Sequence, residues 1–133
     1  MTADSRLSRA VPFPEFGPDH VLRFTTGDLI ALESSYSVKD DALGADPWTK
    51  EIERRLQAND ATFVREAVKL GVKKPGGFAR PEMKDHEWDD LPFSPAAVTQ
   101  KLADAILCAI TGRAYADILQ DREAAEGAAA QAA

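Results

Sequence analysis

Hydrophobic positions in the segment HVLRFTTGDLIALESSY change their period partway along it. The first part alternates residue by residue, which is typical of a half-buried strand. After it, Leu29, Leu32 and Tyr36 recur three and four residues apart, as on one face of a helix. Between the two parts lie Thr25, placed to cap the helix, and Asp28, placed to complete a capping box. The pattern therefore predicts a strand, a cap and a short helix.

Two further helical patterns follow in the middle of the chain. Pro47 stands at the first position of a helix that carries Trp48, Ile52 and Leu56 on one face. A second helix follows after a very short connection, and Gly71 is expected to end it. Because the connection is so short, the two segments form either an angled pair or one kinked helix.

The clearest helical pattern is the segment SPAAVTQKLADAILCAITG. Ser94 stands at its cap, Pro95 at its first position and Gly112 at its end. Its apolar stripe is wide, so we expect this helix to be central in the fold. The stripe consists of Val98, Leu102, Ala105, Ile106, Ala109 and Ile110, with Leu107 and Cys108 extending it.

The remaining segments are less regular. Residues 1–9 are polar and are expected to be disordered, and Pro12 limits any strand at its position to a sheet edge. Residues 73–93 contain three prolines and a Gly-Gly pair, which predicts a long irregular loop. Residues 120–133 are rich in alanine and lack a large apolar face, which predicts a flexible tail.

We therefore expect a single domain over residues 10–119. Its class is α+β, mostly α: a small N-terminal β element followed by about four to five helices around one long core helix.

The composition describes an acidic chain. It has 133 residues, of which 44% are hydrophobic and 29% are charged, and its formal net charge is −6. This charge disfavours contact with a phosphate backbone, and the basic residues in the middle of the chain are interleaved with acidic ones. No stretch reaches the roughly 20 apolar residues of a membrane span, and the first residues lack the apolar core of a secretory signal. We therefore expect a cytoplasmic protein with no nucleic-acid partner and no membrane partner.

Residue patterns that carry chemistry are missing from the sequence. The single cysteine, Cys108, lies in an apolar run, where a small buried side chain is the favoured interpretation. The acidic segment DHEWDD matches neither a calcium loop nor a zinc-binding helix, so we interpret it as a solvated loop. Gly71 and Gly76 have the spacing of a phosphate-binding loop, but the Lys and Ser/Thr of that motif are absent. We therefore expect no catalytic residue, no cofactor, no metal site and no enzymatic activity.

Three aromatic side chains lie in the predicted loop: Phe78, Trp88 and Phe93. They are either anchors that tie the loop to the core or a partner-binding surface. Tyr115, in the helical segment after Gly112, has the same two interpretations. These four aromatic residues are the predicted partner-binding side chains.

Two blocks of the sequence resemble a known family. The segments VLRFTTGDLIALESSYSV and LPFSPAAVTQKLADAILCAITG are similar to the patterns LRLTxGxLxxLE and AVxxxLxxAIxxAL. These patterns characterise the small tail-assembly chaperones of gene transfer agents and long-tailed phages, some of which are labelled tail-tube proteins. The resemblance covers residues 10–112. The matching residues are Leu22, Arg23, Phe24, Thr25, Gly27, Leu29, Leu32 and Glu33 in the first block and Val98, Leu102, Ala105, Ile106 and Ile110 in the second.

The resemblance implies a role in binding without catalysis. Such chaperones coat the tape-measure protein and present it to tail-tube subunits, and they do not remain in the virion. For this chain the resemblance implies a tail-assembly factor of a phage, prophage or gene transfer agent, with both proteins as partners in the host cytoplasm. Self-association of the chain is a further expectation. A structural tail or neck subunit retained in the virion tail is one alternative, and a small helical regulatory or interaction protein is a second.

Overall fold

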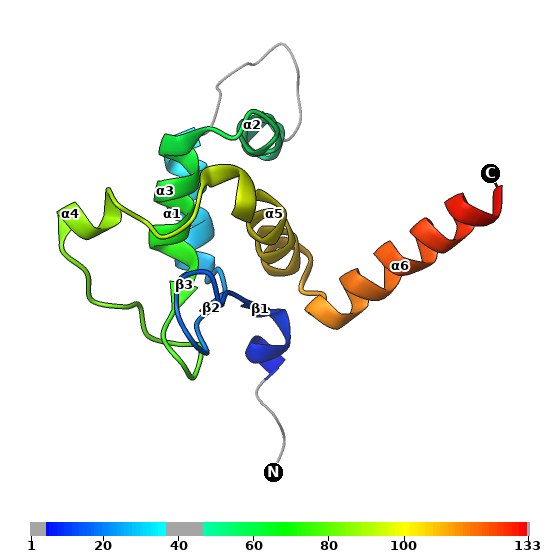
Figure 1. Ribbon diagram of the computed structural model, residues 1–133, viewed down its shortest axis with the longest axis horizontal. Helices are drawn as coiled ribbons and strands as arrows, with labels where there is room; N and C mark the ends of the chain where they lie inside the picture. Colours follow the sequence, from blue (N-terminus) through cyan, green and yellow to red (C-terminus); the bar gives the residue numbers. More distant parts are fainter. Residues whose placement is uncertain (1–4, 37–46, 133) are drawn as a thin grey trace.

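The computed structural model describes residues 5–36 and 47–132. Residues 1–4 and 133 of the two predicted flexible ends lie outside these ranges, and so do the side chains of Tyr36 and Trp48. Within the described ranges, a three-stranded sheet and six α-helices form the fold shown in Figure 1. The fold is α+β and mostly α, as the sequence predicts.

The sheet is small and antiparallel throughout. β1 (Val11–Pro12) pairs with β2 (Val21–Leu22), which also pairs with β3 (Val72–Lys73), so β2 is the central strand. Pro12 has no N–H to donate and lies in an edge strand, as predicted. The sequence prediction missed β3, because its two residues adjoin Pro and Gly residues that indicate a loop.

The first helix, α1 (Thr26–Tyr36), begins with the predicted capping box. The N–H of Thr25 donates to Asp28 Oδ2 at 2.9 Å, and the N–H of Asp28 donates to Thr25 Oγ1 at 3.1 Å. Each side chain thereby satisfies an N–H that the start of a helix leaves without an intrahelical partner. Leu32 is fully buried whereas Ile30 is 58% exposed, so α1 turns its Leu32 side to the core.

Two separate helices follow, α2 (Pro47–Gln57) and α3 (Ala61–Gly71). Between them Asn59 has a φ of 53°, in the left-handed region, which ends the helical path of α2. Asp60 then caps α3 by accepting a hydrogen bond from the N–H of Phe63 at 3.1 Å. Figure 1 shows α2 nearly end-on and α3 lengthwise, so the two helices form an angled pair.

The end of α3 at Gly71 has a different cause from the one expected. Val72 follows with φ −69° and ψ 134°, an extended conformation that leads directly into β3. The helix therefore does not end in a left-handed glycine. Instead, a Cβ on Gly71 would lie 2.6 Å from Cζ of Phe24, so glycine leaves the space that the Phe24 ring occupies.

The long helix α5 (Pro95–Thr111) has the predicted termini. Gly112 has a φ of 74° and donates its N–H to the carbonyl oxygen of Cys108 at 2.8 Å, which satisfies one of the last carbonyls of the helix. α6 (Tyr115–Ala132) then extends away from the rest of the fold, as Figure 1 shows. The predicted flexible tail at residues 120–133 is helical up to Ala132, consistent with the high helix propensity of alanine.

Two other segments also contain more regular structure than expected. Ser5–Arg9 form a 3-10 helix, η1, which contacts α5 and α6. Leu7 of η1 lies against Gly77, where a Cβ would be 2.6 Å from Leu7 Cδ2, so η1 also packs on the segment after β3. α4 (Asp85–Trp88) is a single helical turn within the predicted loop at residues 73–93.

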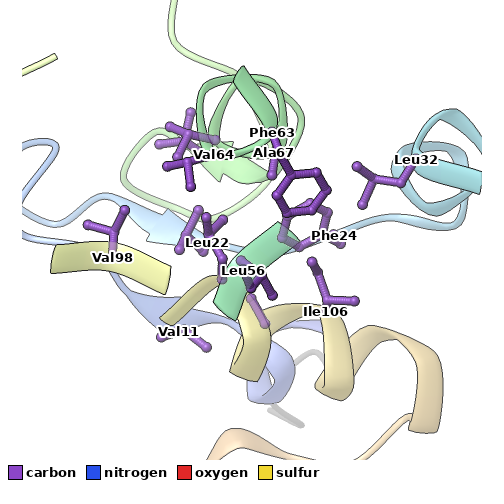
Figure 2. Close-up of a cluster of buried hydrophobic side chains, with 14 of the residues drawn as sticks. Val11, Leu22, Phe24, Leu32, Leu56, Phe63, Val64, Ala67, Val98 and Ile106 are labelled. Atoms are coloured by element: carbon purple, nitrogen blue, oxygen red, sulfur yellow. The ribbon is translucent and has the colours of Figure 1, made fainter. Parts of the chain in front are cut away.

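The core lies between the sheet, α1, α3 and α5. Figure 2 shows side chains from these elements and from α2 converging on one cluster. The expected central position of α5 is confirmed, because it contacts α1, α2, α3, α6, η1 and two strands. The following core residues are at most 5% exposed: Val11, Phe13, Leu22, Phe24, Leu32, Phe63, Val64, Ala67, Val68, Val98, Leu102 and Ala105.

Candidate functional site

Trp88 anchors the 73–93 segment to the body of the protein. It is the last residue of α4 and is 9% exposed. Its ring lies 5.9 Å from the ring of Phe16 between centroids, and Lys69 Nζ lies 5.9 Å from its centroid. The ring is therefore engaged within the molecule, which favours the anchor interpretation of Trp88.

Phe93 is also held by neighbouring rings. It is partly buried, and its ring centroid lies 5.3 Å from that of Phe13, a fully buried core residue. Phe13 in turn stacks on Phe16 at 6.2 Å. This series of aromatic contacts joins the end of the 73–93 segment to the connection between β1 and β2, so Phe93 is likewise an anchor.

Phe78 differs from these two because its ring remains accessible. Its side chain is 46% exposed. The guanidinium carbons of Arg6 and Arg23 lie 4.9 Å and 5.0 Å from its ring centroid, within the range of cation–π contacts. Arg23 is buried and its Nε donates to the carbonyl oxygen of Gly77 at 2.7 Å. Of the four predicted partner-binding residues, Phe78 is the one best placed to meet a partner.

Tyr115 holds the start of α6 against the rest of the fold. It is half-buried and packs on the core cluster. Burial raises the pKa of Tyr115, and the nearby carboxylate of Asp104 raises it further, while Arg122 acts in the opposite direction. Asp104 is 3% exposed on α5 and pairs with Arg122 of α6. These contacts favour the packing interpretation for Tyr115.

An aliphatic groove that the sequence analysis missed lies between α2 and α5, with a volume of about 560 Å³. Its floor contains Ile52, Leu56 and Ile106, which are at most 8% exposed. Its open edge contains Leu107 and Ile110, which are each 44% exposed. The expectation that these two residues face the core is corrected. The apolar run AILCAI covers more of the circumference of α5 than the neighbouring elements bury. This extra width of the apolar stripe could have indicated, from the sequence, that part of it lies at the surface.

The rim of the groove is polar and carries little charge. It is formed by Glu53, Gln57, Thr99 and Gln100. Gln57 Nε2 donates to Glu53 Oε1 at 3.4 Å, and Gln100 Nε2 donates to Asp104 Oδ1 at 3.0 Å. An aliphatic floor between two helices with a polar rim is suited to receiving the apolar face of another helix. The arrangement offers no nucleophile with a neighbouring base.

A buried ion cluster lies where α1 meets β3. Asp28 and Lys73 are 1% and 2% exposed, and Lys73 Nζ lies 3.1 Å from Asp28 Oδ2 and 2.7 Å from the carbonyl oxygen of Leu70. Arg80 pairs with the other carboxylate oxygen. Burial raises the pKa of Asp28, but the N–H of Thr25 and the charges of Lys73 and Arg80 lower it more, so this pKa lies below its usual range.

The contacts of this buried ion cluster indicate a structural role. Burial lowers the pKa of Lys73, and the positive charges of Arg80 and Arg23 act in the same direction against the attraction of Asp28. Among the described residues, every buried side-chain nitrogen and oxygen has a hydrogen-bond partner. The cluster thus joins the start of α1 to β3 and to the segment after it, without an unsatisfied polar atom that would indicate a ligand.

Cys108 and the acidic segment likewise lack the surroundings of a reactive or metal site. Burial raises the pKa of the fully buried Cys108 thiol, and the charge of Asp104 adds to this, so the thiolate is disfavoured. Within residues 5–36 and 47–132, no three His, Cys, Asp or Glu side chains are grouped as metal ligands. In the DHEWDD segment, Asp89 Oδ1 instead pairs with Arg65 at 2.7 Å.

Comparison with known proteins identifies no relative: no family model, no curated protein and no solved structure matches the chain. In the part of the chain that the structure describes, none of the helices has the length and apolarity needed to cross a membrane. The α2–α5 groove is therefore interpreted from its own geometry.

Proposed function

We propose that this protein is a non-enzymatic tail-assembly factor of a phage or gene transfer agent. It binds a helical segment of the tape-measure protein and presents that protein to tail-tube subunits. The observation that carries the proposal is the aliphatic groove between α2 and α5. The resemblance of the two sequence blocks to the chaperone family supports the assignment to tail assembly, and the groove supports the binding of a helix.

The energetics of the groove are those of a reversible contact. Fully burying an aliphatic side chain contributes about 1.5–3 kcal/mol. Leu107 and Ile110 are each 44% exposed, so covering both contributes roughly 1–3 kcal/mol. Several such contacts along a long helical partner provide adequate total affinity, while each one remains easy to release. A factor that must leave the tape-measure protein as the tube forms needs that property.

The proposal is tested by using the full chain as bait in cells that express the neighbouring tail genes. The captured proteins and the purified particles are analysed side by side by mass spectrometry. Capture of a long helical tape-measure protein, with the bait absent from particles, is the expected result. Bait present in particles in stoichiometric amounts would contradict it and would make the protein a structural tail or neck subunit.

A matched pair of variants tests the role of the groove. Ile110→Asp places a charge on its open edge, whereas Ile30→Asp makes the same change on α1 at a side chain that is 58% exposed and does not line the groove. We expect Ile110→Asp to lose capture of the tape-measure protein and Ile30→Asp to retain it, with circular dichroism confirming that both fold. Equal capture by the two variants would rule out the groove as the binding site.

A further inference from the structure

Two distant segments that meet at Phe78 both carry basic residues: Arg6 lies over its ring, and Leu7 of the same segment lies against Gly77. Arg6 comes from η1, and Lys74 and Arg80 come from the segment after β3. Neither η1 nor the segment VKKPGGFAR contains an acidic residue. Asp28 pairs with Arg80 but is itself 1% exposed, so its carboxylate lies beneath the surface. The fold therefore gathers positive charge at one place on a chain whose net charge is −6.

This place also has an apolar centre. Phe78 is 46% exposed and Leu7 is 38% exposed, while the side chain of Arg80 is 54% exposed and Lys74 is exposed. We call these four residues and Arg6 the Phe78 patch. An exposed ring and an exposed leucine with cations around them form a surface that favours an acidic partner with a shallow apolar face.

The outer part of α6 is acidic, and its charge is therefore complementary to that of the Phe78 patch. Arg122 is the residue that pairs with Asp104 of α5, and every side chain over 123–128 is exposed. The terminal segment EAAEGAAAQA of the helix contains two glutamates and no basic residue. Glu123 and Glu126 are three residues apart, so they lie on the same face of the helix.

Gly127 adds an observation that the rest of the molecule does not explain. It lies four residues after Glu123 and therefore on the same face of the helix as that glutamate, and it directly follows Glu126 in the chain. Alanine is the better helix former, and it surrounds Gly127 in the sequence. A Cβ at Gly127 would meet nothing within 4 Å in the molecule, so no internal contact requires a glycine there. The glycine leaves the helix backbone open to close approach by a side chain from outside.

We propose that the chain associates with itself head to tail, with the acidic end of α6 of one copy docked on the Phe78 patch of the next. Glu123 and Glu126 face Lys74 and its neighbouring cations, and the ring of Phe78 packs on the backbone at Gly127. Figure 1 shows the end of α6 on the opposite side of the molecule from β3 and the segment that follows it. The contact therefore joins two different surfaces and produces a ring or a filament.

Self-association is measured on the full chain by sedimentation velocity over a range of protein and salt concentrations. We expect oligomers at low salt that dissociate as salt rises, because the charges on both surfaces are solvent-exposed and are screened by ions. A wild-type chain that stays monomeric at its highest soluble concentration in low salt would overturn the proposal. Oligomers that are insensitive to salt would overturn it as well.

Charge-reversal variants test which surfaces of the two copies meet. Lys74→Glu and Glu126→Lys each place like charges opposite one another, and each is expected to weaken self-association about tenfold or more. The double variant Lys74→Glu/Glu126→Lys restores opposite charges and is expected to recover association. The matched controls are Lys50→Glu and Glu33→Lys, which change the net charge equally at exposed positions on α2 and α1 and should associate as the wild type does.

Two further results test the proposed contact between the two copies. Gly127→Ala is expected to raise the helix content and to weaken association, which separates close approach from helix stability. Single variants that behave like their controls, or a double variant without recovery, would overturn the proposal, once thermal unfolding shows that each variant is folded. The variants leave the α2–α5 groove unchanged, so failure of this proposal is distinguishable from failure of tape-measure binding.

Discussion

The two sides of α5 differ in what covers them. Toward α3 and the sheet, Val98, Leu102 and Ala105 are fully buried. Along the groove beside α2, Leu107 and Ile110 are each 44% exposed. One helix thus contributes to the core on its closed side and lines an open apolar groove on its other side. Because burial on the closed side stabilises the fold, the open side is available for binding at little cost in stability.

The polar groups associated with the two sides of α5 also differ in how deeply they are buried. In the body of the fold that covers the closed side, the Asp28–Lys73 pair joins α1 to β3 and is almost completely removed from water. On the open side, the rim of Glu53, Gln57, Thr99 and Gln100 surrounds aliphatic side chains at the surface. A buried charge pair needs its partner, since an isolated buried charge is strongly unfavourable, whereas a rim amide is satisfied by water. Substitutions on the closed side should therefore have the larger effect on the free energy of unfolding.

The largest effect is expected for Asp28→Asn. It leaves Lys73 buried without its counter-charge, so we expect a loss of about 3–5 kcal/mol in the free energy of unfolding, measured by denaturant titration. The control is Asp89→Asn, which breaks the exposed pair with Arg65 and should cost less than about 1 kcal/mol. Similar losses in the two variants would show that burial of the Asp28–Lys73 pair does not set its importance.

Leu102→Ala should be the next most severe change. The side chain is fully buried, and its truncation leaves a cavity, so a loss of about 2–5 kcal/mol is expected in the same titration. Leu107→Ala makes the same change five residues further along α5, at the edge of the groove, and should cost about 1 kcal/mol or less. If both variants lost the same stability, the distinction between the two sides of α5 would be wrong.

Lowering the pH should weaken the Asp28–Lys73 pair and so reduce the free energy of unfolding. The folded-state pKa of Asp28 lies below its unfolded value of about 3.9, so the stabilisation is present above that value. It is lost as pH falls below the unfolded value and through the folded-state pKa, because protonation then removes the charge that pairs with Lys73. The difference in unfolding free energy between wild type and Asp28→Asn should therefore narrow steadily as the pH is lowered. A constant difference would mean that Asp28 does not titrate with folding.

Chelation should have the smallest effect. Addition of EDTA should change neither the melting temperature nor the capture of partners, because Asp89 in the DHEWDD segment pairs with Arg65 and neither side of α5 presents a set of metal ligands among the described residues. A clear shift in melting temperature would revive a metal site at residues 85–90.

The local features of the fold were predictable from the sequence alone. The capping box of Thr25 and Asp28, the start of α5 after Ser94 and its end at Gly112 all appear where the sequence placed them, although the Ser94 side chain makes no capping hydrogen bond. Each depends on hydrogen bonds or backbone angles within a few residues. Neighbouring residues meet in every compact conformation of the chain, so such signals do not depend on the rest of the fold.

Other features were decided by the tertiary structure. β3 exists because Val72 pairs with Leu22, fifty residues away, and Trp88 is buried because Phe16 lies beside it. Ile110 is exposed because α2 leaves that edge of α5 uncovered. The sequence determined which side chains are apolar, charged or cap-forming. Their burial depended on which distant segments came to lie against them, and that follows from the packing of the whole domain.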